Sequence, residues 1–90
     1  MKRIIASPFA PKAVGPYSQA VEANGTLYIS GQLPIDPATG KMVEGIEAQT
    51  ARSLDNIRAI LEEAGYTLDD VVKSTVLLAD IADFGAMNAV

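Results

Sequence analysis

The segment from Ile46 to Ala64 constrains the fold most, because it is a long stretch of this 90-residue chain with a helical period. Its apolar residues recur at about 100° per residue, and charged residues such as Arg52 and Glu62 fall on the opposite side. The apolar face consists of Ile46, Leu54, Ile57, Ile60, Leu61 and Ala64. The pattern predicts an amphipathic helix of about five turns. Gly65 follows where a left-handed C-terminal cap is expected.

Short strands are predicted on the N-terminal side of this helix. Residues 3–7 form one candidate, and residues 18–22 and 26–30 form two more. The Asn24-Gly25 pair between the last two readily takes the positive φ angles of a tight hairpin turn. Residues 34–40 contain two prolines and a glycine, which favour a surface loop.

Residues 71–78 are rich in Val, Thr and Leu and predict a central strand. Strand, helix and strand would then form a right-handed crossover, with the helix on one face of the sheet. We expect another subunit to cover the other face. Asp80 is typical of an N-cap for a second helix. Because no stop signal precedes Val90, we expect the chain to break off inside that helix and therefore to be truncated.

The composition limits the kinds of function. The net charge is −4, with scattered Lys and Arg residues, which disfavours a nucleic-acid partner. The absence of Cys and His removes the thiolate nucleophile and the commonest nitrogen ligand for metals. We predict no metal and no cofactor. The apolar run after Met1-Lys2-Arg3 is too short for a signal peptide or a membrane span. We expect a cytoplasmic protein with a single domain over residues 1–90 and, because 49% of the residues are apolar, a subunit interface.

Two segments carry the most information: Gly15-Pro16-Tyr17-Ser18-Gln19-Ala20 and Tyr28-Ile29-Ser30-Gly31-Gln32-Leu33-Pro34. Both resemble signatures of the RidA family, also called the YjgF family. The resemblance continues in order through residues 48–50, 53–57, 64–65, 72–76 and 83–84. No single short motif among these is diagnostic, but the colinear set is specific.

The resemblance implies a chorismate-mutase-like α+β fold, with a mixed β-sheet and two helices packed on one face, here cut off before the C-terminal strands. It also implies a homotrimer with clefts between subunits. The implied reaction is the hydrolytic deamination of reactive 2-imino acids and enamines, such as 2-aminoacrylate, to 2-keto acids and ammonia. An iminium carbon is already electrophilic, so its hydrolysis needs no strong base or nucleophile from the protein. A site without His or Cys can therefore promote the reaction by orienting one water.

The same resemblance assigns catalytic roles to Tyr17 and Ser30 and substrate binding to Gly31 and Asn88. Taken alone, Tyr17 also suits a loop aromatic that caps the core, and Ser30 a strand-end hydroxyl bonded to the backbone. Gly31 also suits a bulge or tight turn.

The family's carboxylate-binding arginine and its water-positioning glutamate have no counterpart in these 90 residues. We therefore expect this form to be weak or inactive. Two alternative functions remain open: a non-catalytic protein that binds small carboxylates, and a translation inhibitor with endoribonuclease activity.

Overall fold

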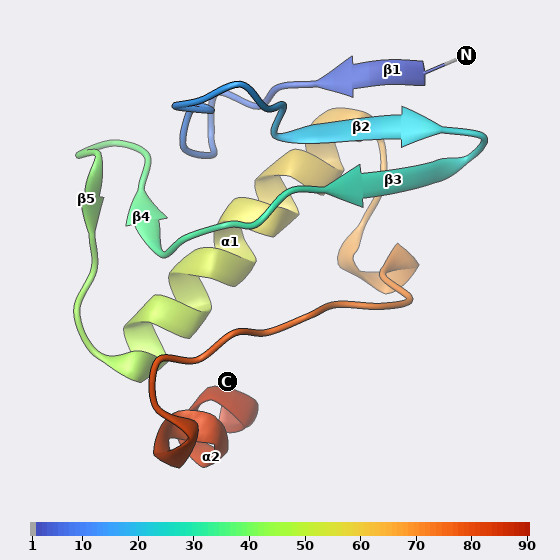
Figure 1. Ribbon diagram of the computed structural model, residues 1–90. Coiled ribbons are helices and arrows are strands. Elements are labelled where there is room, and N and C mark those ends of the chain that lie inside the picture. The colour runs from blue at the N-terminus through green and yellow to red at the C-terminus, as the bar shows by residue number, and fades with distance from the viewer. Residues whose placement is uncertain (1) are drawn as a thin grey trace.

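A three-stranded antiparallel sheet and a long helix make up the body of the fold (Figure 1). The structure is a computed structural model that describes residues 2–90. The sheet consists of β1 (Lys2–Ile5), β2 (Ala20–Ala23) and β3 (Thr26–Ile29), in that order. The remaining elements, in chain order, are β4 (Ile35–Asp36), β5 (Lys41–Met42), α1 (Ile46–Ala64), the 3-10 turns η1 (Leu68–Asp70) and η2 (Ile81–Asp83), and α2 (Phe84–Ala89).

The turn between β2 and β3 is the predicted tight hairpin. Asn24 has a φ of 53° and Gly25 a φ of 77°, and positive φ at both central residues is what a type I′ hairpin turn requires. The loop predicted at residues 34–40 is more ordered than expected, because β4 pairs with β5 across it.

The helix α1 has the predicted bounds, and Gly65, whose φ of 88° is left-handed, caps its C-terminal end. It lies across one face of the sheet, and Ile60 and Ala64 pack in one core cluster with Ile5 and Ala20. One position of the predicted apolar face was wrong: Leu54 is 42% exposed. The fully buried position on α1 beside Ile60 is polar, Asn56.

The outer face of the sheet carries an apolar row. Ile4 pairs with Val21, and Val21 pairs with Tyr28, so these side chains lie side by side on the face away from α1. Ile4 is 65% exposed and Tyr28 is 63% exposed. The sequence therefore places apolar side chains on a sheet face that the chain itself leaves open to solvent.

The central strand predicted at residues 71–78 does not form. This segment has no strand pairing, and Val72 and Leu77 are more than 90% exposed. Figure 1 shows it running from η1 to η2 apart from the sheet, so its backbone has no strand edge beside it to complete a ladder. The strand pairings among residues 2–90 are all antiparallel, and the parallel pairing that would make the sheet mixed is absent from this part of the chain.

The second helix is short and begins later than predicted. The Asp80 carboxylate does act as an N-cap, because it accepts a hydrogen bond from the Ala82 N–H at 2.9 Å, but it caps η2. The following helix, α2, contacts α1 and lies beyond it on the side away from the sheet. Within the described chain, no helix has both the length and the apolar character needed to cross a bilayer.

Candidate active site

A hollow of about 320 Å³ lies between the loop that leads into β2 and the loop that follows β3. We call it the loop pocket. Its walls are formed by Pro11, Lys12, Val14 and Tyr17 on the first side and by Gly31, Gln32, Leu33, Ile35, Pro37 and Gly40 on the second. This volume is at the lower end of the range for ligand sites, so the pocket suits a small molecule.

A buried amide holds the first wall. Gln19 is 5% exposed, and its Oε1 accepts a hydrogen bond from the Ser7 N–H at 2.6 Å. Its Nε2 donates to the carbonyl oxygens of Pro11 at 2.8 Å, Ser7 at 3.2 Å and Ala10 at 3.4 Å. Because the loop contains prolines and no regular structure, these bonds supply the partners that its backbone needs. Gln19 thereby fixes the position of Pro11 at the edge of the pocket.

A second buried amide holds the opposite wall. The Asn56 side chain is fully buried, and its Nδ2 donates to the carbonyl oxygens of Leu33 at 3.1 Å and Ile35 at 3.0 Å. Its Oδ1 accepts a hydrogen bond from Arg52 Nε at 3.2 Å. The loop after β3 is thus tied to the middle of α1. Each wall of the pocket depends on one neutral amide whose polar atoms are all bonded.

Two of the predicted site residues, Tyr17 and Gly31, meet in the loop pocket. The Tyr17 side chain is half-exposed, and its hydroxyl oxygen accepts a long hydrogen bond of 3.4 Å from the Val14 N–H. That bond leaves the hydroxyl proton available to a ligand. A Cβ atom placed on Gly31 would meet nothing within 4 Å, so the main chain there faces open space.

The other two predicted residues do not line this pocket. The Ser30 hydroxyl is 3.0 Å from both the Ser18 and the Gln19 carbonyl oxygens, which is the backbone-bonded alternative stated above. Asn88 is exposed on α2. The catalytic role of Ser30 and the binding role of Asn88 stay predictions.

Lys12 and Gln32 line the pocket, and the sequence alone did not single them out. Gln32 stands inside one signature segment, and Lys12 lies three positions before Gly15, the start of the other. Their positions within or close to these segments could have identified Lys12 and Gln32 as candidate site residues.

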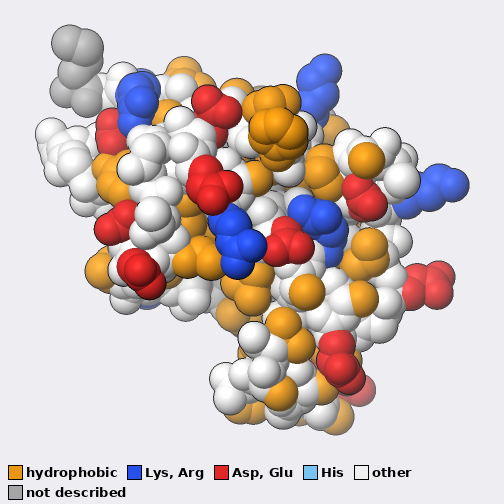
Figure 2. Space-filling view, turned by 180° about the vertical axis from the view of Figure 1, so that it is seen from behind, with side chains coloured by type: hydrophobic (Ala, Val, Ile, Leu, Met, Phe, Trp, Pro, Cys, Tyr) orange, Lys and Arg blue, Asp and Glu red, His pale blue; other side chains and the backbone are white. Residues whose placement is uncertain are grey.

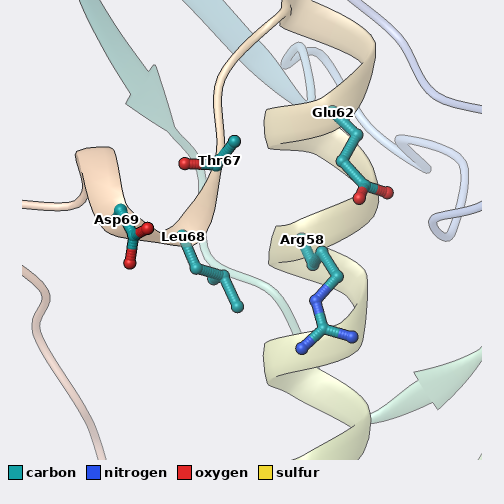
Figure 3. A pocket seen from close by; sticks show the side chains of 5 residues that line it. All are labelled: Arg58, Glu62, Thr67, Leu68 and Asp69. Carbon is teal, nitrogen blue, oxygen red and sulfur yellow. The ribbon is translucent and has the colours of Figure 1, made fainter.

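A second hollow, of about 220 Å³, lies between α1 and η1 (Figure 3). Arg58 and Glu62 line it from the helix, and Thr67, Leu68 and Asp69 line it from the other side. Arg58 is already 3.9 Å from Asp55, and in Figure 3 the carboxylates of Glu62 and Asp69 lie on opposite sides of the gap. The charged groups do not converge on one point, so this hollow is a weaker candidate than the loop pocket.

The perturbed titrating groups, Glu22 and Tyr66, line neither hollow. Tyr66 donates its hydroxyl to Glu22 Oε2 at 2.5 Å, which lowers the pKa of Glu22 and raises the pKa of Tyr66. Arg3 adds to the lower pKa of Glu22 through a 3.1 Å ion pair, and also donates to the Ala64 carbonyl oxygen at 2.9 Å. This cluster ties β1 and β2 to the C-terminal end of α1. Its role is structural.

Fold and pocket define a small α+β protein whose candidate ligand site is built from two loops. A family model described as Endoribonuclease L-PSP matches residues 8–90. The chain is 56% identical over 91 residues to a RutC family protein of Pyrococcus horikoshii, covering 100% of this chain and 72% of that relative. It is 45% identical over 89 residues to a 2-iminobutanoate/2-iminopropanoate deaminase of Salmonella typhimurium, covering 99% and 70%.

A solved structure agrees with the sequence comparisons. RidA from the Antarctic bacterium Psychrobacter sp. superposes with a TM-score of 0.94 at 49% identity, covering 97% of this chain and 71% of that one. The chain belongs to the RidA family. The predicted family and its α+β fold class are thus confirmed.

Proposed function

We propose that this chain hydrolyses 2-imino acids and their enamine tautomers to 2-oxo acids and ammonia. The observation that carries the proposal is the loop pocket, which Tyr17 and the open main chain of Gly31 both line. Relatives from Salmonella typhimurium, Capra hircus and Bos taurus that are named 2-iminobutanoate/2-iminopropanoate deaminase support it.

The chemistry needs little from the protein. Water adds to the carbon of the C=N bond, one of its protons passes to the nitrogen, and the resulting carbinolamine expels ammonia and leaves a carbonyl group. Tyr17 can donate to or accept from the water or the nitrogen, and the Gly31 main chain can orient the substrate. A positioned group that moves a proton in this way contributes about 10²- to 10⁴-fold.

We further propose that turnover by this form is low, because the pocket lacks a strong carboxylate clamp. Lys12 is the charged side chain among the described residues that line the pocket, and no arginine stands there. A lysine binds a carboxylate as a point charge, whereas an arginine binds it through two parallel hydrogen bonds.

We also propose that the active species is a homotrimer with its clefts between subunits. The exposed apolar row Ile4, Val21 and Tyr28 supports the association of copies through the outer face of the sheet. The exposed residues Val71, Val72, Val76 and Leu77 add apolar surface that a neighbouring subunit would cover.

Release of pyruvate and ammonia from freshly generated 2-aminoacrylate, measured above the spontaneous rate, tests the activity. Tyr17→Phe is expected to lower the catalysed rate at least ten-fold. The matched control is Tyr66→Phe, which removes a hydroxyl that is bonded to Glu22 outside the pocket. If the wild-type chain gives no acceleration at any concentration, the proposed function is wrong.

The family model's name raises a nuclease as an alternative, but the surface argues against it. The chain has 11 acidic and 7 basic residues, and Figure 2 shows them interspersed over one face of the molecule. A phosphate backbone is bound by clustered basic residues, with a steep salt dependence. RNA binding with such a dependence would favour the nuclease, and ligand binding without imine turnover would favour a non-catalytic binder.

A further inference from the structure

We propose that Lys12 makes this pocket select substrates with a second carboxylate, that is, 2-imino acids whose side chain ends in an acidic group. The inference rests on the proposed function, since it names the substrate class of the same site. It depends on three observations: where Lys12 lies, what surrounds it, and how its loop is held.

Lys12 stands in the first wall of the loop pocket, on the same loop as Tyr17. The other polar groups that line the described pocket are neutral: the Tyr17 hydroxyl, the Gln32 amide and the main chain of Gly31. The remaining lining residues are apolar or glycine. The pocket therefore combines an apolar lining and neutral hydrogen-bonding groups with a single positive charge.

The ammonium group of Lys12 has no acidic partner among residues 2–90. The ion pairs found there join Arg3 to Glu22 and Arg58 to Asp55. Lys12 lines the pocket and is exposed, so the residue stands at the rim and its charge is solvated until a ligand arrives. An anionic group on that ligand would gain an ion pair without breaking one.

The loop that carries Lys12 is held on both sides of the residue. Gln19 bonds the Pro11 carbonyl oxygen at 2.8 Å, and the Val14 N–H donates to the Tyr17 hydroxyl at 3.4 Å. The backbone of Lys12 is thus anchored between two bonded neighbours, while its long side chain can still adjust. A fixed base with a flexible tip suits a charge that meets the distal end of a ligand.

The reacting end of an imino acid is assigned to Tyr17 and Gly31 under the proposed function, which leaves the side chain of the substrate for the rest of the pocket. A pocket of about 320 Å³ accommodates a small acid. If that side chain is apolar, the α-carboxylate is the one negative charge that the substrate offers to Lys12. If it ends in a carboxylate, as in 2-iminosuccinate or 2-iminoglutarate, the ammonium group becomes its counter-ion.

The test compares two product-like acids of equal chain length, 2-oxoglutarate and 2-oxopentanoate, by calorimetric binding to the full chain. Lys12→Gln should raise the ratio of their Kd values, 2-oxoglutarate over 2-oxopentanoate, about two- to five-fold, the range of an exposed ion pair. Lys12→Arg should preserve the wild-type ratio. Arg58→Gln, which removes a positive charge from an exposed site on α1 outside the pocket, should leave the ratio unchanged.

Added salt should shrink the wild-type preference, because an ion pair at the rim is screened. The inference is overturned if Lys12→Gln weakens the binding of both acids equally, if the Arg58→Gln control shifts the ratio as much, or if neither acid binds. Turnover of 2-aminoacrylate is measured in parallel. An inactive chain that still shows the Lys12-dependent ratio would refute the proposed function and leave the charge selection standing.

Discussion

Removal of the Asn56 amide is the perturbation with the largest effect that the structure predicts on both stability and the site. Asn56→Ala leaves the carbonyl oxygens of Leu33 and Ile35 without their donor and takes away the acceptor of Arg52. Each lost bond is worth about 0.5 to 1.5 kcal/mol, and a stranded buried polar group costs about 1 to 3 kcal/mol. These bonds are only partly buried, so we expect a loss of about 2 to 4 kcal/mol in the free energy of unfolding.

Urea unfolding followed by far-ultraviolet circular dichroism measures this loss. Asn56→Leu refines it, because leucine nearly preserves the side-chain volume and stays uncharged while it removes the amide. A similar loss in that variant would assign the effect to the lost hydrogen bonds, not to a cavity. Glu63→Ala on the exposed face of α1 is the control and should stay within about 0.5 kcal/mol of the wild type.

The Asn56 variants should also weaken 2-oxopentanoate binding, because Leu33 and Ile35 line the loop pocket. Glu63→Ala should leave that binding unchanged. The reasoning is refuted if Asn56→Ala unfolds within about 0.5 kcal/mol of the wild type, since the two carbonyl groups would then exchange Asn56 for water at no cost.

Three further outcomes are expected. Gly65→Ala should lower the free energy of unfolding by about 1 to 2 kcal/mol, because an alanine must adopt the left-handed φ of 88°. The space around Gly65 is open, so this penalty comes from the backbone conformation and not from a clash. A loss below about 0.3 kcal/mol in urea unfolding would contradict this. The Tyr66 hydroxyl, and to a smaller extent Arg3, lower the pKa of Glu22 in the folded state. The unfolded chain therefore binds more protons than the folded chain near pH 4. Stability should therefore fall as the pH drops from about 4.5 through the folded pKa, and Glu22→Gln should flatten that part of the melting-temperature profile. Tyr28→Glu places a charge in the outer apolar row and should shift the proposed trimer toward monomers in light scattering; an unchanged mass would argue against that interface.

The sequence predicted well those elements that satisfy their own backbone. An α-helix closes its hydrogen bonds within one segment, so the periodicity of Ile46–Ala64 and the glycine after it were enough to give both ends. The β2–β3 hairpin is equally local, because its turn is specified by Asn24 and Gly25.

The elements that depend on distant partners were predicted less well. Residues 71–78 have the composition of a strand, but a strand exists only when another edge completes its ladder, and composition does not supply that edge. Asn56 shows the same limit inside a well-predicted helix. Its buried position depends on two carbonyl groups more than 20 residues away, and no periodicity of apolar side chains contains that information.

This division also explains how the site can vary. Gln19 and Asn56 fix the two walls of the pocket through hydrogen bonds to the main chain. Both side chains are neutral, so they add no charge to the pocket. Lys12 contributes charge at the rim and makes none of those bonds. A substitution at a wall amide should therefore change stability and the binding of every ligand together, whereas a substitution at the rim should change which ligand is preferred. We expect the same unfolding and binding assays to separate these two responses. A Lys12 variant that loses as much stability as Asn56→Ala would show that the walls and the rim are one unit.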